Sequence, residues 1–204
     1  MSPPATEAAF AGLALVLLAG GQSTRFGGAK LMAELGGTPL GLHAAAMLAD
    51  LPFAARYAVT GPDVPDLAAL GYTSVPLDPP GAPQARSLAL GVAAAQAGGA
   101  RAVLVALADM PLVPAGHIHT LVAAFAGDRI ATSADGVTMP PALFGARHFA
   151  ALAALGGDRG GASLLKSAPT VPLDPRLALD VDRPEDLTRA AAQFALMRSG
   201  RTPL

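Results

Sequence analysis

The stretch LALVLLAGGQSTRFGGAK (residues 13–30) joins an apolar run to a glycine-rich segment. Its first part is a continuous apolar run, the pattern of a strand buried on both faces of a parallel sheet. The second part is rich in glycine and holds Arg25 and Lys30, although the chain has only 14 Lys and Arg among 204 residues. Glycine in a turn after a strand lets backbone N–H groups approach a phosphate closely. The stretch therefore predicts a buried strand that ends in an anion site.

Apolar runs alternate with alanine-rich segments along the rest of the first 126 residues. The runs predict strands at 13–18, 56–60, 73–76 and 102–107, and the alanine-rich segments predict helices at 39–50, 63–70, 85–97 and 114–126. Such alternation builds βαβ units and a mainly parallel sheet. We expect an α/β fold, a single three-layer domain with a Rossmann-like sheet and helices on both faces.

The pattern changes after Asp128. Short extended segments are predicted at 130–133 and 141–144, helices at 148–155 and 161–166, and a last helix starting within DVDRPEDL (residues 180–187). Pro184 suits the first turn of that helix, and the acidic residues after it suit the helix dipole. We expect one domain over residues 1–197 and a flexible tail over 198–204.

Charge and cysteine content exclude several classes of function. The net charge is −1, so no overall positive field would recruit nucleic acid or an anionic membrane. The chain has no cysteine, which excludes disulfides, thiolate metal sites and a cysteine nucleophile. Residues 8–20 lack a preceding basic region and are too short to span a bilayer, so they favour a buried strand over a signal sequence. We expect a cytoplasmic protein.

The glycine loop matches neither of two common phosphate-binding patterns. It contains no Gly-x-Gly-x-x-Gly, and Lys30 follows Ala29, so no Gly-Lys-Ser/Thr is present. Two cations five residues apart remain, and charge-assisted contacts to phosphate oxygens are strong. The loop could hold a triphosphate, and the alternative is a turn whose Arg25 and Lys30 are simply solvated.

A set of short motifs in a fixed order carries a family resemblance. The motifs are LAGGxSxRFGGxK (18–30), QARSLALG (84–91), LADMP (107–111), PALF (141–144), GDRG (157–160) and DVDRPED (180–186). Together they resemble the nucleotide-sugar-pyrophosphorylase-like nucleotidyltransferases, most closely the molybdenum-cofactor nucleotidyltransferases and their molybdopterin cytidylyltransferase branch. The resemblance covers nearly the whole chain and implies the nucleotide-diphospho-sugar-transferase type of α/β fold.

The resemblance implies that the loop binds the nucleotide. The backbone at Ala19, Gly20 and Gly21 would contact base and ribose, Arg25 and Lys30 the phosphates, and Arg25, Lys30 and Asp109 would be catalytic. The full nucleotide-binding set is Leu18, Ala19, Gly20, Gly21, Ser23, Arg25, Lys30, Ser87 and Asp109.

The resemblance also implies a Mg²⁺ ion bound by Asp109 of the Asp-Met-Pro motif. Mg²⁺ is commonly held by one or two carboxylates together with phosphate oxygens and water. The second carboxylate is expected from Asp180 or Asp182, which would share one face of a strand, and Asp182 is favoured. The alternative for this segment is a helix cap at Asp182 or Arg183.

The acceptor implied by the resemblance is molybdopterin. The motifs that hold Pro141, Phe144, Asp158 and Arg159 resemble the half of the family site that receives it, and the alternative for Asp158 and Arg159 is a tight turn between helices. Transfer of a nucleoside monophosphate from a nucleoside triphosphate to the terminal phosphate of molybdopterin would release pyrophosphate. Transient contact with an apo-molybdoenzyme would follow.

The motifs disagree about the base. The later motifs look like those of cytidylyltransferases, whereas Leu-Ala-Gly-Gly is the form usual for guanylyl transfer. More of the chain favours CTP, and GTP stays the alternative. Two other functions also stay open, namely transfer to a sugar or alditol phosphate, and a cofactor carrier that serves a molybdenum hydroxylase.

Overall fold

The computed structural model describes residues 5–21, 23–155 and 161–199. Its strands are β1 (Leu13–Ala19), β2 (Glu34–Leu35), β3 (Thr38–Pro39), β4 (Ala55–Thr60), β5 (Thr73–Pro76), β6 (Ala102–Leu107), β7 (Arg129–Ala134), β8 (Val137–Gly145) and β9 (Thr170–Pro172). Its helices are α1 (Ala5–Phe10), α2 (Leu40–Ala49), α3 (Gln84–Ala97), α4 (Ala115–Ala124), α5 (Phe149–Ala153) and α6 (Pro184–Arg198). Short 3₁₀ turns are η1 (Lys30–Met32), η2 (Ala68–Leu70), η3 (Ala146–His148) and η4 (Ala162–Leu165).

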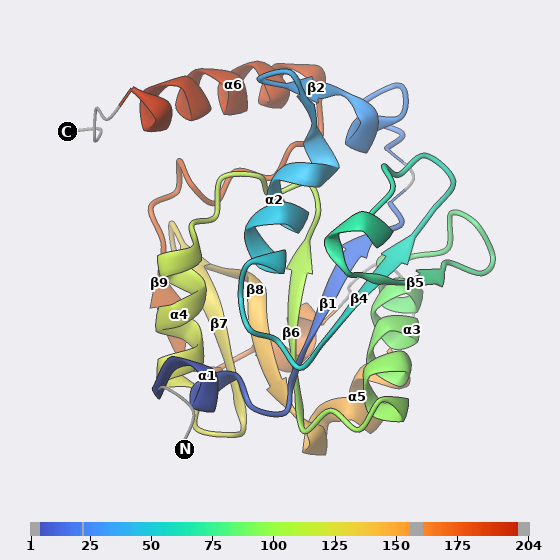
Figure 1. The fold of residues 1–204 in the computed structure, drawn as a ribbon, viewed down its shortest axis with the longest axis vertical. Helices are drawn as coiled ribbons and strands as arrows, with labels where there is room; N and C mark the ends of the chain where they lie inside the picture. The colour runs from blue at the N-terminus through green and yellow to red at the C-terminus, as the bar shows by residue number, and fades with distance from the viewer. Residues whose placement is uncertain (1–4, 22, 156–160, 200–204) are drawn as a thin grey trace.

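A central sheet of seven strands organises the described residues, in the order β5-β4-β1-β6-β8-β7-β9. The pairings of β1 with β4 and β6, and of β4 with β5, are parallel, while β8 runs antiparallel to both β6 and β7. The arrowheads of β1 and β6 point toward the end of the molecule that α6 crosses (Figure 1). The expected mainly parallel α/β sheet is confirmed, and the carboxyl ends of its two central strands meet at one edge.

Both faces of β1 are buried, which explains its continuous apolar run. Leu13, Leu15 and Leu17 pack into the core layer that includes α2 and α4, whereas Val16 and Leu18 face the layer with α3 and α5. Helix α3 lies very close to the sheet at Gly91. A Cβ at this position would come within 2.3 Å of Val16 Cγ1. The three expected layers are therefore present.

The expected helix at residues 63–70 is wrong. Only the 3₁₀ turn η2 forms there, because Pro65 disfavours the helical conformation at the residue before it and Gly71, with a left-handed φ of 78°, ends the turn. Asp66 Oδ1 accepts a hydrogen bond from the backbone N–H of Ala68 inside this short segment. The helix expected at residues 161–166 is likewise only the turn η4, and that expected at 148–155 shrinks to α5 after η3. Residues 180–182 form no strand, whereas a last helix begins at Pro184 as predicted.

Helices lie near both ends of the described residues. Helix α1 precedes the first strand, and α6 continues to Arg198, one residue into the expected tail. Residues 200–204 of that tail lie outside the described residues. Over the part of the chain that the structure describes, no helix is both long and apolar enough to cross a membrane.

Candidate active site

The glycine loop leaves β1 as a tight turn at the edge where β1 and β6 end. Ser23 adopts a left-handed φ of 50°, and its carbonyl accepts hydrogen bonds from the N–H groups of Phe26 and Gly27. This turn exposes Arg25, whereas Lys30 begins η1 with its side chain only 7% exposed. The loop therefore offers one exposed cation and one buried cation to the same edge.

Three carboxylates face these cations from two distant parts of the chain. Asp109 lies two residues after β6, and its carbonyl accepts a 3.0 Å hydrogen bond from the backbone N–H of Val181. This bond ties the segment that carries Asp180 and Asp182 to the end of β6. One carboxylate oxygen from each aspartate lies within 4.8 Å of the others.

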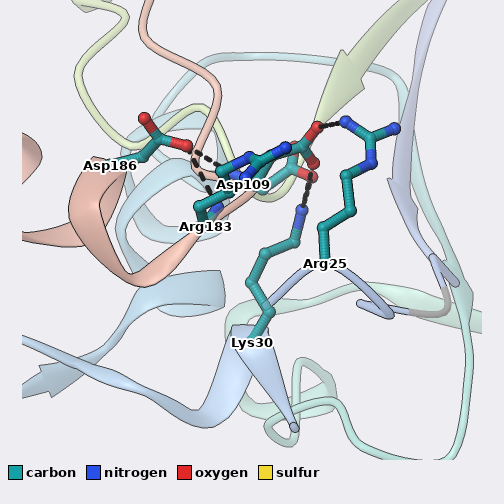
Figure 2. A network of polar contacts seen from close by, with 6 residues as sticks. Arg25, Lys30, Asp109, Arg183 and Asp186 are labelled. Atoms are coloured by element: carbon teal, nitrogen blue, oxygen red, sulfur yellow. Dashed lines mark hydrogen bonds and ion pairs between the residues drawn. The ribbon is translucent and has the colours of Figure 1, made fainter. Parts of the chain in front are cut away.

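The start of α6 holds that segment from the other side. Asp186 Oδ2 accepts hydrogen bonds from the backbone N–H groups of Asp182 (3.2 Å) and Arg183 (3.0 Å), as Figure 2 shows for Arg183 and Asp186. The acidic first turn predicted from the sequence therefore caps the helix and fixes the backbone beneath the site. Arg183 itself is the N-cap residue.

Ion pairs join the loop cations to the carboxylates (Figure 2). Lys30 Nζ lies 2.7 Å from Asp109 Oδ2 and 3.1 Å from Asp182 Oδ1, and Arg25 Nη1 lies 2.5 Å from Asp182 Oδ2. Burial opposes the charge on Lys30, but Asp109, helped by Asp180 and Asp182, outweighs burial and raises the pKa of Lys30 above its ordinary value. Lys30 is therefore a permanent cation in this site.

The remaining acceptor positions suit a divalent metal. Loss of surrounding water and the neighbouring Asp109 carboxylate, opposed by Lys30, raise the pKa of Asp180 to about 7. When Asp180 is ionised, the buried Asp109 Oδ1 has no hydrogen-bond partner among the described residues. An unpartnered buried carboxylate oxygen beside a second carboxylate is the donor set that a hard cation such as Mg²⁺ takes. The residues present therefore fit the divalent ion implied by the sequence.

A polar pocket of about 600 Å³ opens above this cluster. It is bounded by the glycine loop, the three carboxylates and the start of α3. Its lining residues are Leu18, Gly20, Gly21, Ser23, Thr24, Arg25, Lys30, Gly81, Ala82, Pro83, Gln84, Ser87, Leu107, Asp109, Asp180 and Asp182.

An apolar pocket of about 240 Å³ adjoins the polar pocket. The two share Leu18, Gln84, Leu107 and Asp180. The other lining residues are Leu88, Val105, Met110, Met139, Pro140, Ala142, Phe144, Gly161, Leu165 and Ala178. None of the described residues in this wall is a cation, so the apolar pocket suits an uncharged group.

Most residues predicted for the site converge on these pockets. Ala19 lines a third hollow of about 280 Å³ on the other side of the glycine loop, which also borders Gly20, Gly21 and Ser23. Pro141 does not reach the apolar pocket, because its side chain faces α2 and α4 across the sheet. Asp158 and Arg159 lie outside the described residues.

Sequence reasoning missed several lining residues. Gln84, on the border of both pockets, opens the quoted QARSLALG motif, and Met139 and Pro140 directly precede the PALF motif. The available signal was membership of a motif for Gln84 and position next to a motif for Met139 and Pro140. The aliphatic residues of the apolar pocket read only as core.

The fold and the site together define an α/β domain in which a glycine loop with two cations faces a carboxylate cluster. The family model described as "MobA-like NTP transferase domain" matches residues 15–172. The chain belongs to this family and is a nucleotidyltransferase. A search of curated protein sequences gives no match.

Solved structures share the fold at low sequence identity. A homologue of Mycobacterium tuberculosis Rv0371c from Mycobacterium sp. strain JC1 is 24% identical, with a TM-score of 0.77 over 91% of this chain and 98% of that chain. A nucleotidyl transferase from Methanothermobacter (Mth528) is 19% identical, with a TM-score of 0.74 over 91% and 98%. Rv0371c of M. tuberculosis, solved as a complex with manganese, is 22% identical, with a TM-score of 0.70 over 88% and 98%.

Proposed function

We propose that this nucleotidyltransferase moves a cytidylyl group from CTP to the terminal phosphate of molybdopterin and releases pyrophosphate. The observation that carries the proposal is one polar pocket, with two loop cations and three carboxylates, joined directly to an apolar pocket. The first pocket suits a metal triphosphate and the second suits the uncharged part of an acceptor. The ordered motifs that resemble the molybdenum-cofactor branch support the identity of that acceptor.

The chemistry needs positioning and charge more than it needs a base. An oxygen of the acceptor's terminal phosphate attacks the α-phosphorus of CTP and forms a new P–O bond. The bond from the α-phosphorus to the oxygen that bridges to the β-phosphate breaks, and pyrophosphate leaves with the electron pair. A phosphate oxyanion is already a nucleophile near neutral pH, so Arg25 and Lys30 contribute by holding phosphate oxygens and offsetting their charge.

Mg²⁺ is the cofactor of the proposal, bound through Asp109 together with Asp180 or Asp182. When bound, it supplies positive charge to the phosphate oxygens. Ser23 and the buried Ser87 border the polar pocket and are proposed to contact the nucleotide with Leu18, Ala19, Gly20 and Gly21.

The packing around Gly20 removes one argument for GTP. A Cβ at this position would lie 2.8 Å from Leu77 Cδ2 and 3.4 Å from Ser87 Oγ. Gly20 therefore has a packing reason of its own, and its presence does not have to report a guanine. GTP is the second candidate, favoured by the Leu-Ala-Gly-Gly form of the loop.

The apolar pocket supports molybdopterin over a sugar or alditol phosphate. A polyhydroxylated chain in this pocket would leave hydroxyl groups without partners, which costs binding energy. A flat ring in this pocket would bury its faces against Phe144 and its neighbours, with Gln84 and Asp180 in the same wall for its polar edge. Phe144, Asp158 and Arg159 are proposed as acceptor-binding residues, and the product is proposed to pass to an apo-molybdoenzyme in the cytoplasm.

Calorimetric titration with CTP and with GTP in the presence of Mg²⁺ tests the nucleotide half of the proposal. Preference for CTP is expected, and preference for GTP would reassign the base. Binding of neither nucleotide would contradict the enzyme and favour a cofactor carrier. Titration of Asp109→Asn with Mg²⁺ and CTP is the control for metal-dependent binding.

A further inference from the structure

The three carboxylates of the site are not equivalent. Both oxygens of Asp182 already accept a hydrogen bond from a cation. Oδ1 accepts from Lys30 at 3.1 Å, and Oδ2 accepts from Arg25 at 2.5 Å. Asp109 uses only Oδ2, for Lys30 at 2.7 Å, and its buried Oδ1 forms no ion pair with the described residues. Asp180 forms no salt bridge with any described residue and borders both pockets.

The cost of displacing the cations differs between these carboxylates. A divalent ion on Asp182 would have to take an oxygen from Arg25 or from Lys30. Lys30 is almost fully buried, and removing one partner of a buried charge is strongly destabilising. A divalent ion on Asp109 Oδ1 and Asp180 leaves every ion pair in place.

The geometry points to a division of labour. We infer that Asp182 is a positioning residue that holds Arg25 and Lys30 in place for the phosphates, and that Asp109 and Asp180 are the carboxylates that bind the divalent metal. This inference rests on the proposed nucleotidyl transfer. It reverses the preference for Asp182 as second metal ligand that the sequence alone produced.

The ion pair between Asp182 and Arg25 shows what the positioning role does. Arg25 is exposed on the glycine loop, 157 residues away from Asp182 in the sequence, and no other ion pair of Arg25 occurs among the described residues. Asp182 therefore orders an otherwise solvated side chain over the polar pocket before a phosphate arrives. Ordering it in advance lowers the entropic cost of binding.

The substitution Asp182→Asn isolates this role. The backbone N–H of Asp182 is held by Asp186 and that of Val181 by the Asp109 carbonyl, so the segment keeps its place without the charged side chain. Asp174→Asn is the matched control, because Asp174 forms a comparable pair with Arg176 on the surface away from both pockets.

The test measures binding of Mn²⁺ alone, by the electron paramagnetic resonance signal of the free ion. Asp109→Asn and Asp180→Asn, which each remove a ligand, are expected to weaken Mn²⁺ binding by at least ~100-fold. Asp182→Asn removes only a nearby charge and is expected to weaken it by ~10-fold, whereas Asp174→Asn stays within ~3-fold of the unsubstituted chain. Loss of Mn²⁺ in Asp182→Asn equal to that in Asp109→Asn would overturn the inference. Unchanged Mn²⁺ binding in Asp180→Asn would overturn it as well.

A double-substitution cycle tests the positioning half. In kcat/KM for CTP, Arg25→Met is expected to cost much less when Asp182 is already Asn than when it is intact, because the two side chains act as one unit. Equal cost in both backgrounds would contradict the positioning role. Mn²⁺ binding as expected without any affinity for CTP would overturn the proposed function and still support the assignment of the metal to Asp109 and Asp180.

Discussion

The polar and apolar pockets meet at a common border, yet they are built from opposite kinds of residue. The polar pocket is walled by the glycine loop, Arg25, Lys30 and three carboxylates, while the apolar pocket is walled mainly by aliphatic side chains, Met139 and Phe144. Asp180 belongs to both walls. A phosphate bound at this border would have its charge on one side and an uncharged group on the other.

A single sheet edge can therefore offer separate pockets to two substrates. Charged residues enter the polar pocket from the ends of β1 and β6 and from the segment before α6, whereas the antiparallel strand β8 adds an apolar wall beside them. Substitutions in one wall should therefore affect one substrate and spare the other.

Asp109→Asn should act on the polar pocket alone and have the largest effect. It removes the charge of a carboxylate that pairs with Lys30 and is proposed to bind the metal, so kcat for nucleotidyl transfer should fall by ~10³-fold. Steady-state pyrophosphate release measures this change. The matched control is Asp128→Asn, an acidic residue paired with His148 and outside both pockets. A near-normal rate in Asp109→Asn would remove Asp109 from the chemistry.

Met139→Glu should act on the apolar pocket alone. A carboxylate in this wall lacks a cationic partner among the described lining residues, so KM for the acceptor should rise by ~30-fold while the affinity for CTP stays unchanged. Val137→Glu, on the same strand but 56% exposed, should leave both constants unchanged. Equal weakening of CTP binding by Met139→Glu would show that the two pockets are not separate sites.

Metal binding should depend on pH through Asp180, which borders both pockets. Its pKa is raised from 3.8 to about 7, so lowering the pH through this value adds a proton that a metal must displace. Mn²⁺ affinity should fall ~10-fold between about pH 8 and about pH 6. Equilibrium binding across this range measures the slope, and a slope that persists in Asp180→Asn would assign the titration to another group.

The raised pKa of Asp180 also makes the stability of the metal-free chain depend on pH. A rise in pH strengthens Mn²⁺ binding but lowers the stability of the metal-free fold. A carboxyl whose folded pKa lies above its unfolded value stabilises the folded state least when it is ionised in both states. The metal-free chain should therefore lose stability as the pH rises from about 4 to about 7, and Asp180→Asn should reduce that loss. Urea unfolding at several pH values, with a chelator present, measures it.

Gly20→Ala should have the smallest effect and sharpen the choice of base. The new methyl group meets Leu77 Cδ2, the end of a flexible side chain that can move by a few tenths of an ångström. The ratio of CTP to GTP affinity should change by less than ~3-fold, because the added methyl group meets Leu77 and Ser87 and is not expected to contact the base. A large gain in CTP preference, measured by calorimetry, would return Gly20 to the role of base selector.

The fold was predictable wherever burial on both faces left a mark in the sequence. β1 and β6 are continuous apolar runs because helices cover both faces, and both strands were found within one residue of their observed ends. The segment at 63–70 was not, because its alanines and leucines suit a helix while Pro65 prevents one. Local composition could not weigh these two influences against each other.

The candidate site was predictable at residues whose charge is unusual for their surroundings. Arg25, Lys30 and Asp109 stand out in a chain with few charges, and the structure brings them together with Asp180 and Asp182. The apolar pocket was not predictable in the same way, because Leu88 or Met110 in a pocket wall reads like any core residue. The pairing of Asp182 with both cations depends on distances that only the folded chain supplies.

Pyrophosphate release with CTP, Mg²⁺ and molybdopterin together, with the mass of the product recorded, tests whether the two pockets form one catalytic site. Pyrophosphate is expected only when both substrates are present, together with a product heavier than molybdopterin by one cytidylyl group. Release of pyrophosphate with GTP alone as nucleotide would change the base and keep the reaction. No release with either nucleotide, from a chain that binds both CTP and molybdopterin, would contradict the claim that these two pockets form one catalytic site.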